Sequence, residues 1–102
     1  MYQFKNKIQL IGCTDNPTIS VLENGIKKAR FSITTTESFT DLEGNKNCSP
    51  ICHICYAFGK LADIVERYLS MGNEIAVEGK LITEKQITYI NVSDLLLLGK
   101  HT

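Results

Sequence analysis

Hydrophobic and polar positions alternate along the chain in short segments that predict β-strands. The clearest segment begins at Lys28, where Ala29, Phe31 and Ile33 occupy one face and polar residues occupy the other. A period of two residues places successive side chains on opposite sides of a strand. This segment is therefore expected to be a half-buried strand with one polar, partly basic face.

Four further segments predict strands, and residues typical of turns separate them. Asn24 and Gly25 give a turn signal before the second strand, and residues 41–47 have loop composition with a hairpin tip at residues 43–45. The five predicted strands are residues 7–12, 28–34, 52–58, 74–81 and 87–92, the last extended by residues 95–98.

The segment between the third and fourth strands changes period and predicts a helix. After Gly59 the apolar residues recur at the spacing of one helix face, and Gly72 provides a natural end. Asp63 and Arg67 stand four residues apart, which favours an ion pair along the helix. The predicted apolar face comprises Leu61, Ile64, Val65, Tyr68 and Leu69.

Five short strands with one helix between the third and fourth are the element order of the OB-fold, a five-stranded Greek-key barrel that often binds oligonucleotides or oligosaccharides. No linker-like composition and no internal repeat divides the chain. We therefore predict an all-β protein in which residues 1–102 form a single OB-fold domain.

Charge and signal patterns narrow the classes of function. Lysine plus arginine equals aspartate plus glutamate at 11 each, so the overall charge does not favour nucleic acid and any such site depends on where charges lie. Residues 1–6 show no apolar leader, and no apolar run approaches the roughly 20 residues that span a bilayer. We expect a cytoplasmic protein without a membrane partner.

Cys13, Cys48, Cys52 and Cys55 raise the question of a metal site. Cys52 and Cys55 are three residues apart on a predicted strand, so they should point to opposite faces and not to one zinc ion. His53 lies on the face opposite Phe58, which favours the core or a subunit contact. We expect free thiols, no metal, no cofactor and no cysteine nucleophile.

One long stretch, FGKLADIVERYLSMGNEIAVEGKL at residues 58–81, resembles the central region of the bacterial single-stranded DNA-binding protein (SSB) family. Residues 6–12 (NKIQLIG) are similar to the family's first strand, and residues 24–39 to its second strand and following loop. The resemblance covers nearly the whole chain. It implies a non-enzymatic homo-oligomer, dimer or tetramer, that binds single-stranded DNA without sequence preference and acts with replication or repair proteins.

The resemblance also implies a set of binding residues. Phe39 stands where the family usually has a stacking tryptophan, Phe58 matches its stacking phenylalanine, and Lys60 and Lys85 match phosphate-contacting positions. Strand alternation adds Tyr56 to the face of Phe58. Packing in the core is the alternative for the rings, and a merely solvated face is the alternative for the cations. The expected cations also include Lys7, Lys28 and Arg30.

The departures from the family pattern predict weak binding. Cys52 replaces a common tryptophan, Gln86 stands near the place of another, and Ile54, Ile82 and Glu84 occupy positions where arginine is common. At about 1 to 3 kcal/mol for each lost stack, affinity should fall by about two orders of magnitude or more. The family's acidic tail has no counterpart after residue 98. The alternative function is therefore an OB-fold adaptor of the primosomal replication-restart kind, acting mainly through protein contacts.

Overall fold

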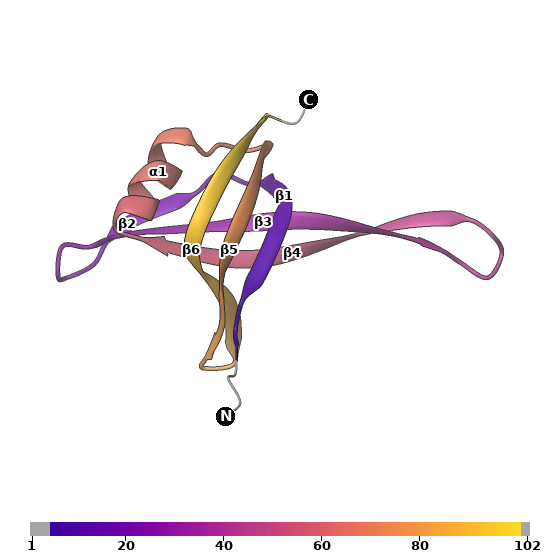
Figure 1. Ribbon diagram of the computed structural model, residues 1–102, viewed down its shortest axis with the longest axis horizontal. Coiled ribbons are helices and arrows are strands. Elements are labelled where there is room, and N and C mark those ends of the chain that lie inside the picture. Colours follow the sequence, from indigo (N-terminus) through magenta and orange to yellow (C-terminus); the bar gives the residue numbers. More distant parts are fainter. Residues whose placement is uncertain (1–4, 101–102) are drawn as a thin grey trace.

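The computed structural model describes residues 5–100 and, within them, the side chains of all residues except 37–39 and 100. Long strands dominate the fold, and a single short helix among the described residues packs at one end (Figure 1). The elements are β1 (Ile8–Thr14), β2 (Thr18–Val21), β3 (Lys27–Thr40), β4 (Lys46–Phe58), α1 (Lys60–Tyr68), β5 (Asn73–Glu84) and β6 (Ile87–Lys100).

Five of the strands close into a ring. They follow the order β1-β5-β6-β4-β3, and a short pairing of β1 with β3 completes the circle. All pairings are antiparallel except the one between β4 and β6, which is parallel. This ring, with α1 between β4 and β5, confirms the predicted OB-fold. The sequence did not predict β2, a strand of 4 residues that pairs only with β3 among the described strands.

The interior of the ring is filled by apolar side chains, including the face of β3 that the alternation predicted. Phe31 and Ile33 of β3 are at most 2% exposed, and Cys55 of β4 and Ile75 of β5 are completely buried. Val65 of α1 closes one end of this core with no exposed surface. The two-residue period therefore identified the inner face of β3 correctly.

The β3–β4 hairpin is longer than predicted and projects from the body as an arm (Figure 1). The sequence placed the start of the third strand at Cys52, but β4 begins at Lys46 and pairs with β3 up to Thr40. The predicted turn lies at the arm's tip. There the Asp41 carboxylate accepts hydrogen bonds from the backbone N–H groups of Glu43 at 3.0 Å and Asn45 at 2.9 Å.

One close approach explains how the ring closes. A Cβ atom at Gly12 of β1 would lie 2.3 Å from the carbonyl oxygen of Thr34 in β3, so only glycine fits where the two strands meet. The adjacent pairs Cys13–Thr34 and Thr14–Ile33 form the short β1–β3 ladder. Gly12 therefore permits the contact that turns an open sheet into a ring.

Helix α1 buries part of the apolar face that was predicted, with Val65 in the core and Leu61 packed against it. Ala62, Val65 and Leu69 are buried, whereas Ile64 is 36% exposed and Tyr68 is 56% exposed. Ile64 and Tyr68, the two other members of the predicted face, are turned toward solvent, and the buried side of the helix includes small Ala62. The spacing of the large apolar residues therefore indicated the buried side of the helix only approximately.

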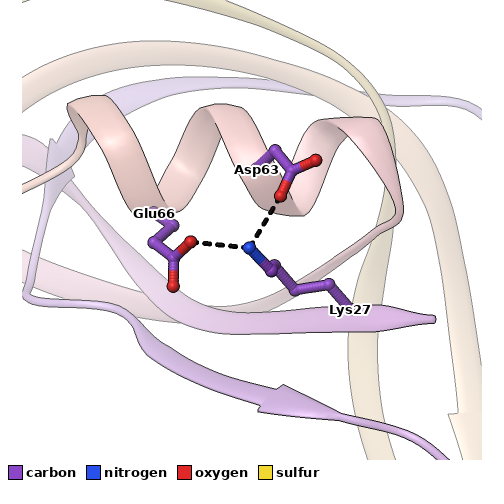
Figure 2. A network of polar contacts seen from close by, with 3 residues as sticks. All are labelled: Lys27, Asp63 and Glu66. Atoms are coloured by element: carbon purple, nitrogen blue, oxygen red, sulfur yellow. Dashed lines mark hydrogen bonds and ion pairs between the residues drawn. The ribbon is translucent and has the colours of Figure 1, made fainter. Parts of the chain in front are cut away.

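A lysine at the start of β3 fastens the helix to the sheet (Figure 2). Lys27 Nζ lies 2.7 Å from Asp63 Oδ1 and 2.6 Å from Glu66 Oε1. Hydrogen bonding to Lys27 lowers the pKa of the Asp63 carboxyl below its ordinary value. The predicted partner of Asp63 within the helix was Arg67, and this was wrong: Arg67 is only a minor electrostatic influence on Asp63, whose ion pair is with β3.

Candidate nucleic-acid interface

A groove of about 600 Å³ crosses the outer face of the ring where β3 begins and β4 ends. It lies between two hairpins, the β2–β3 turn and the β5–β6 tip, which point away from the body in Figure 1. Rings, aliphatic groups and cations share its walls. The lining residues are Leu22, Lys28, Tyr56, Phe58, Glu84, Lys85, Ile87 and Tyr89.

The register of β3 and β4 places the predicted residues on this outer face. Lys28 lies opposite Phe58, and Arg30 lies opposite Tyr56. The intervening pair, Ala29 with Ala57, is completely buried. Alternation therefore points both cations and both rings outward from the same two strands.

Phe58 is the exposed ring at the rim of the groove. Its side chain is 37% exposed although it ends a central strand. Gly59 follows with φ of 64°, in the left-handed region that favours glycine, and starts α1 directly after the ring. The Gly59 N–H donates to the Lys27 carbonyl at 2.9 Å, which fixes this corner. Phe58 thus presents an apolar surface to solvent on a rigid support.

Tyr56 is held by two neighbours. The ring of Tyr89 meets it edge to face with centroids 4.8 Å apart, and Lys28 Nζ lies 4.6 Å from the Tyr56 ring centroid. An ammonium over an aromatic face is attracted by the ring's quadrupole. Tyr56 therefore serves as a support that orders Lys28 and Tyr89, and it is less free to stack than Phe58.

Tyr89 is a groove residue that the sequence analysis did not single out. It lies on β6, where Ile90 and Val92 are buried and Tyr89 is half-buried on the opposite face. The alternation of Ile90 and Val92 within residues 87–92 was a signal that could have found it.

The short β5–β6 hairpin brings a cation to the groove. Glu84 pairs with Ile87, so the turn consists of Lys85 and Gln86, with φ values of 50° and 68°. Two residues with positive φ are typical of the turn that matches the twist of paired strands. The hairpin therefore sets Lys85 at the tip and Glu84 and Ile87 in the wall beneath it.

Glu84 affects the pKa of the Tyr89 hydroxyl group. Desolvation raises the pKa of Tyr89 above its ordinary value, and the Glu84 carboxylate adds to the increase by its charge and by a side-chain hydrogen bond. Tyr89 thus keeps a neutral hydroxyl group at physiological pH, in the same groove lining as the Glu84 side chain.

The remaining predicted binding residues lie outside the groove lining. Lys60 is exposed at the first position of α1, and Arg30 is exposed on β3 beside Tyr56. Lys7 precedes β1 and its Nζ lies 2.5 Å from Glu78 Oε1. Phe39 pairs through its backbone with Asn47 in the arm, but its side chain is outside the described residues. The structure gathers Tyr56, Phe58, Lys28 and Lys85, and places Lys7 in an ion pair elsewhere.

The cysteines diverge as predicted. Cys52 is exposed and Cys55 is buried on the other side of β4. Burial raises the pKa of the Cys55 thiol to about 12, so it stays protonated. His53 Nε2 lies 3.4 Å from the Thr35 hydroxyl in a half-buried position. Within the part of the chain that the structure describes, no three metal-binding side chains gather at one point.

Helix α1 has 9 residues. No helix within residues 5–100 is long and apolar enough to cross a membrane.

Known proteins resemble this chain over most of its length. The chain is 34% identical over 105 residues to Single-stranded DNA-binding protein 1 of Chlorobaculum tepidum, a match that covers 92% of this chain and 65% of that protein. It is 35% identical over 106 residues to Single-stranded DNA-binding protein 1 of Xylella fastidiosa, covering 93% of this chain and 78% of that one. The chain thus spans slightly less than two thirds of the length of the first relative.

Two solved structures have folds similar to that of this chain. A Plasmodium falciparum SSB in complex with ssDNA superposes with a TM-score of 0.86 at 31% identity, covering 96% of this chain and 98% of that chain. A single-stranded DNA-binding protein from Thermus aquaticus, at 21% identity and a TM-score of 0.79, supports the fold alone. Residues 5–93 match the sequence model of one family along most of the chain. With ring topology, sequence and structural neighbours in agreement, the chain belongs to the single-strand binding protein family.

Proposed function

We propose that this protein binds single-stranded DNA with little sequence preference, as a non-catalytic DNA-binding protein of replication, recombination or repair in the cytoplasm. The observation that carries the proposal is the exposed Phe58 ring in a groove that also holds Lys28 and Lys85. A flat ring accepts the face of any base, and cations beside it contact the backbone without reading sequence. The relatives named as single-stranded DNA-binding proteins support the same function.

The role that we propose for each residue follows from the exposure of its side chain and from its contacts. Phe58 stacks a base, Tyr56 supports the groove, and Lys28 and Lys85 contact phosphates. Lys60 and Arg30, exposed beside the groove, extend the cationic track, and Phe39 is proposed as a second ring on the arm. Lys7 contributes least because Glu78 already neutralises it.

Homo-oligomer formation is the second part of the proposal. Ile11 of β1 and Leu96 of β6 are each 63% exposed, and Leu98 is 46% exposed. An apolar face of this kind on a small domain favours association with a second copy. Sedimentation at micromolar concentration should give a dimer or tetramer, and a species of only 11.4 kDa would contradict this part.

Binding is tested with fluorescently labelled dT oligonucleotides at two salt concentrations. We expect binding that weakens with salt, because phosphate contacts release counterions. Duplex DNA of equal length should bind much more weakly, since its bases are stacked away from the rings. Absence of binding to dT at low salt would refute DNA binding and leave the adaptor function in its place.

A further inference from the structure

Of the described residues that line the groove, Glu84 alone is acidic. A carboxylate is unexpected in a site for a phosphate chain, because like charges repel and the effect grows where water is partly excluded. Lys85, the next residue, supplies a cation at the same hairpin tip and offsets that repulsion. The Glu84 carboxylate is therefore expected to contact a group other than phosphate.

The chemistry of the bases provides one. An ionised carboxylate only accepts hydrogen bonds, and the exocyclic amino groups of cytosine and adenine are donors. Thymine and uracil carry a carbonyl oxygen at the corresponding position, and their one donor on the base edge, N3–H, lies between two carbonyl oxygens that repel a carboxylate. A carboxylate beside a stacked base thus favours cytosine and adenine over thymine and uracil.

Glu84 is held where such a contact can form. It ends β5 at a tight turn, so its backbone is fixed by the pairing with Ile87. Tyr89 lies diagonally across the hairpin from Glu84, and the Glu84 carboxylate is close enough to help raise the pKa of the Tyr89 hydroxyl. Tyr89 is itself fixed by its edge-to-face contact with Tyr56 at 4.8 Å. This chain of contacts positions an acceptor in the wall of the groove that also holds Phe58.

We propose that Glu84 gives the groove a modest preference for single-stranded DNA rich in cytosine or adenine over DNA rich in thymine or uracil. Tyr89 acts as a positioning residue that orients the carboxylate. The inference rests on the proposed function, since it assumes that the strand passes through this groove. It adds base selectivity to a surface whose rings and lysines provide none.

Oligomers of dC and dU of equal length test the proposal, because the two bases share a pyrimidine ring without a methyl group and differ at the amino or keto edge. Affinities are measured at one salt concentration and neutral pH, where cytosine is unprotonated. The unmodified protein should bind dC more tightly. In Glu84→Gln this advantage should fall by about fivefold or more, because an amide both donates and accepts and so serves either base.

Two control variants separate selectivity from simple charge. Glu43→Gln, at the distant tip of the β3–β4 arm, makes the same change in net charge and should leave the ratio of dC to dU affinity unchanged. Tyr89→Phe retains the ring and removes the hydroxyl. It should reduce the ratio in the same direction as Glu84→Gln, but by less.

The outcomes are distinct. If Glu84→Gln strengthens binding of dC and dU equally, the carboxylate only repels phosphate and the proposal is wrong. Equal affinity of the unmodified protein for dC and dU would also overturn it, while leaving the proposed function intact. If neither oligomer binds, the proposed function fails and this inference fails with it.

Discussion

The inner and outer faces of the β3–β4 hairpin differ in how their side chains are packed. On the inner face Phe31 and Cys55 are paired, buried and packed against the other strands. On the outer face Lys28 and Phe58 are paired as well, but one wall of their surroundings is open groove. The backbone ladder is common to both faces. Stability should therefore depend on the inner side chains and DNA affinity on the outer ones, and substitutions one residue apart should separate the two properties.

The largest expected effect is on the inner face. Phe31→Ala should lower the free energy of unfolding by about 3 to 5 kcal/mol, because it removes a large buried ring and leaves a cavity. Urea denaturation at fixed protein concentration measures this. Ile51→Ala, in the arm and 38% exposed, is the matched aliphatic control and should cost about 1 kcal/mol or less. Similar losses of stability in the two variants would show that burial inside the ring does not determine the cost of the substitution.

The next effect is on the outer face. Phe58→Ala should weaken binding to poly-dT by about 1 to 3 kcal/mol, with little dependence on salt, since stacking involves no counterion. Its free energy of unfolding should change by about 1 kcal/mol or less because the ring is partly exposed already. Anisotropy titrations at two salt concentrations, combined with denaturation, test both statements. A loss of stability as large as that of Phe31→Ala would place Phe58 in the core.

Cations on the outer face should show a smaller and different effect. Lys28→Ala should reduce the slope of log affinity against log salt by up to about one unit, because at most one phosphate contact is lost. Lys60→Ala should behave in the same way. Lys7→Ala is the control whose ammonium is bound to Glu78, and its slope should match that of the unmodified protein. If the salt slopes of all three variants equal that of the unmodified protein, Lys28 and Lys60 do not contact phosphate.

Much of this arrangement could be predicted from alternation, and the exceptions have physical causes. In β3 every second residue is apolar, and this alternation predicted the buried face formed by Ala29, Phe31 and Ile33. The apolar spacing in helix α1 included Val65 and Leu69, which are buried, but not small Ala62, which is buried as well. The pairing of Lys27 with Asp63 joins residues far apart in the chain and could not be predicted from local spacing.

The groove was predictable in part. Phe58 and Tyr56 followed from strand alternation and family resemblance, but the wall formed by Glu84, Ile87 and Tyr89 depends on how the β5–β6 hairpin folds over β4. A sequence pattern fixes which side of a strand a residue occupies. It does not fix which hairpin covers that side.

The smallest predicted effect concerns the ion pairs at the start of β3. The Asp63 pKa is lowered, so its contribution to stability is present above the unfolded value of about 3.9 and lost as pH falls through the lower folded value. The Lys27 pKa is raised, chiefly by hydrogen bonding to Asp63 and then Glu66, so its contribution is lost as pH rises through the raised folded value, above about 10.4. The pair stabilises the fold between these limits.

Lys27→Met tests this pair because it retains most of the aliphatic stem. The melting temperature of the variant should lie slightly below that of the unmodified protein at neutral pH. The two should converge as pH falls through the lowered pKa of Asp63 and as pH rises through the raised pKa of Lys27. A difference that is constant over this range would show that Lys27 acts by packing and not by charge.

Closure of the ring by β1 has a consequence for the speed of folding. The first strand pairs with β5, so residues near the start of the chain, such as Ile8, must find partners as distant as Gly79. The β3–β4 hairpin joins sequence neighbours and forms without that search. We therefore expect the hairpin to form early and β1 to dock late, with overall refolding in about milliseconds to seconds, as in other domains dominated by distant strand pairings.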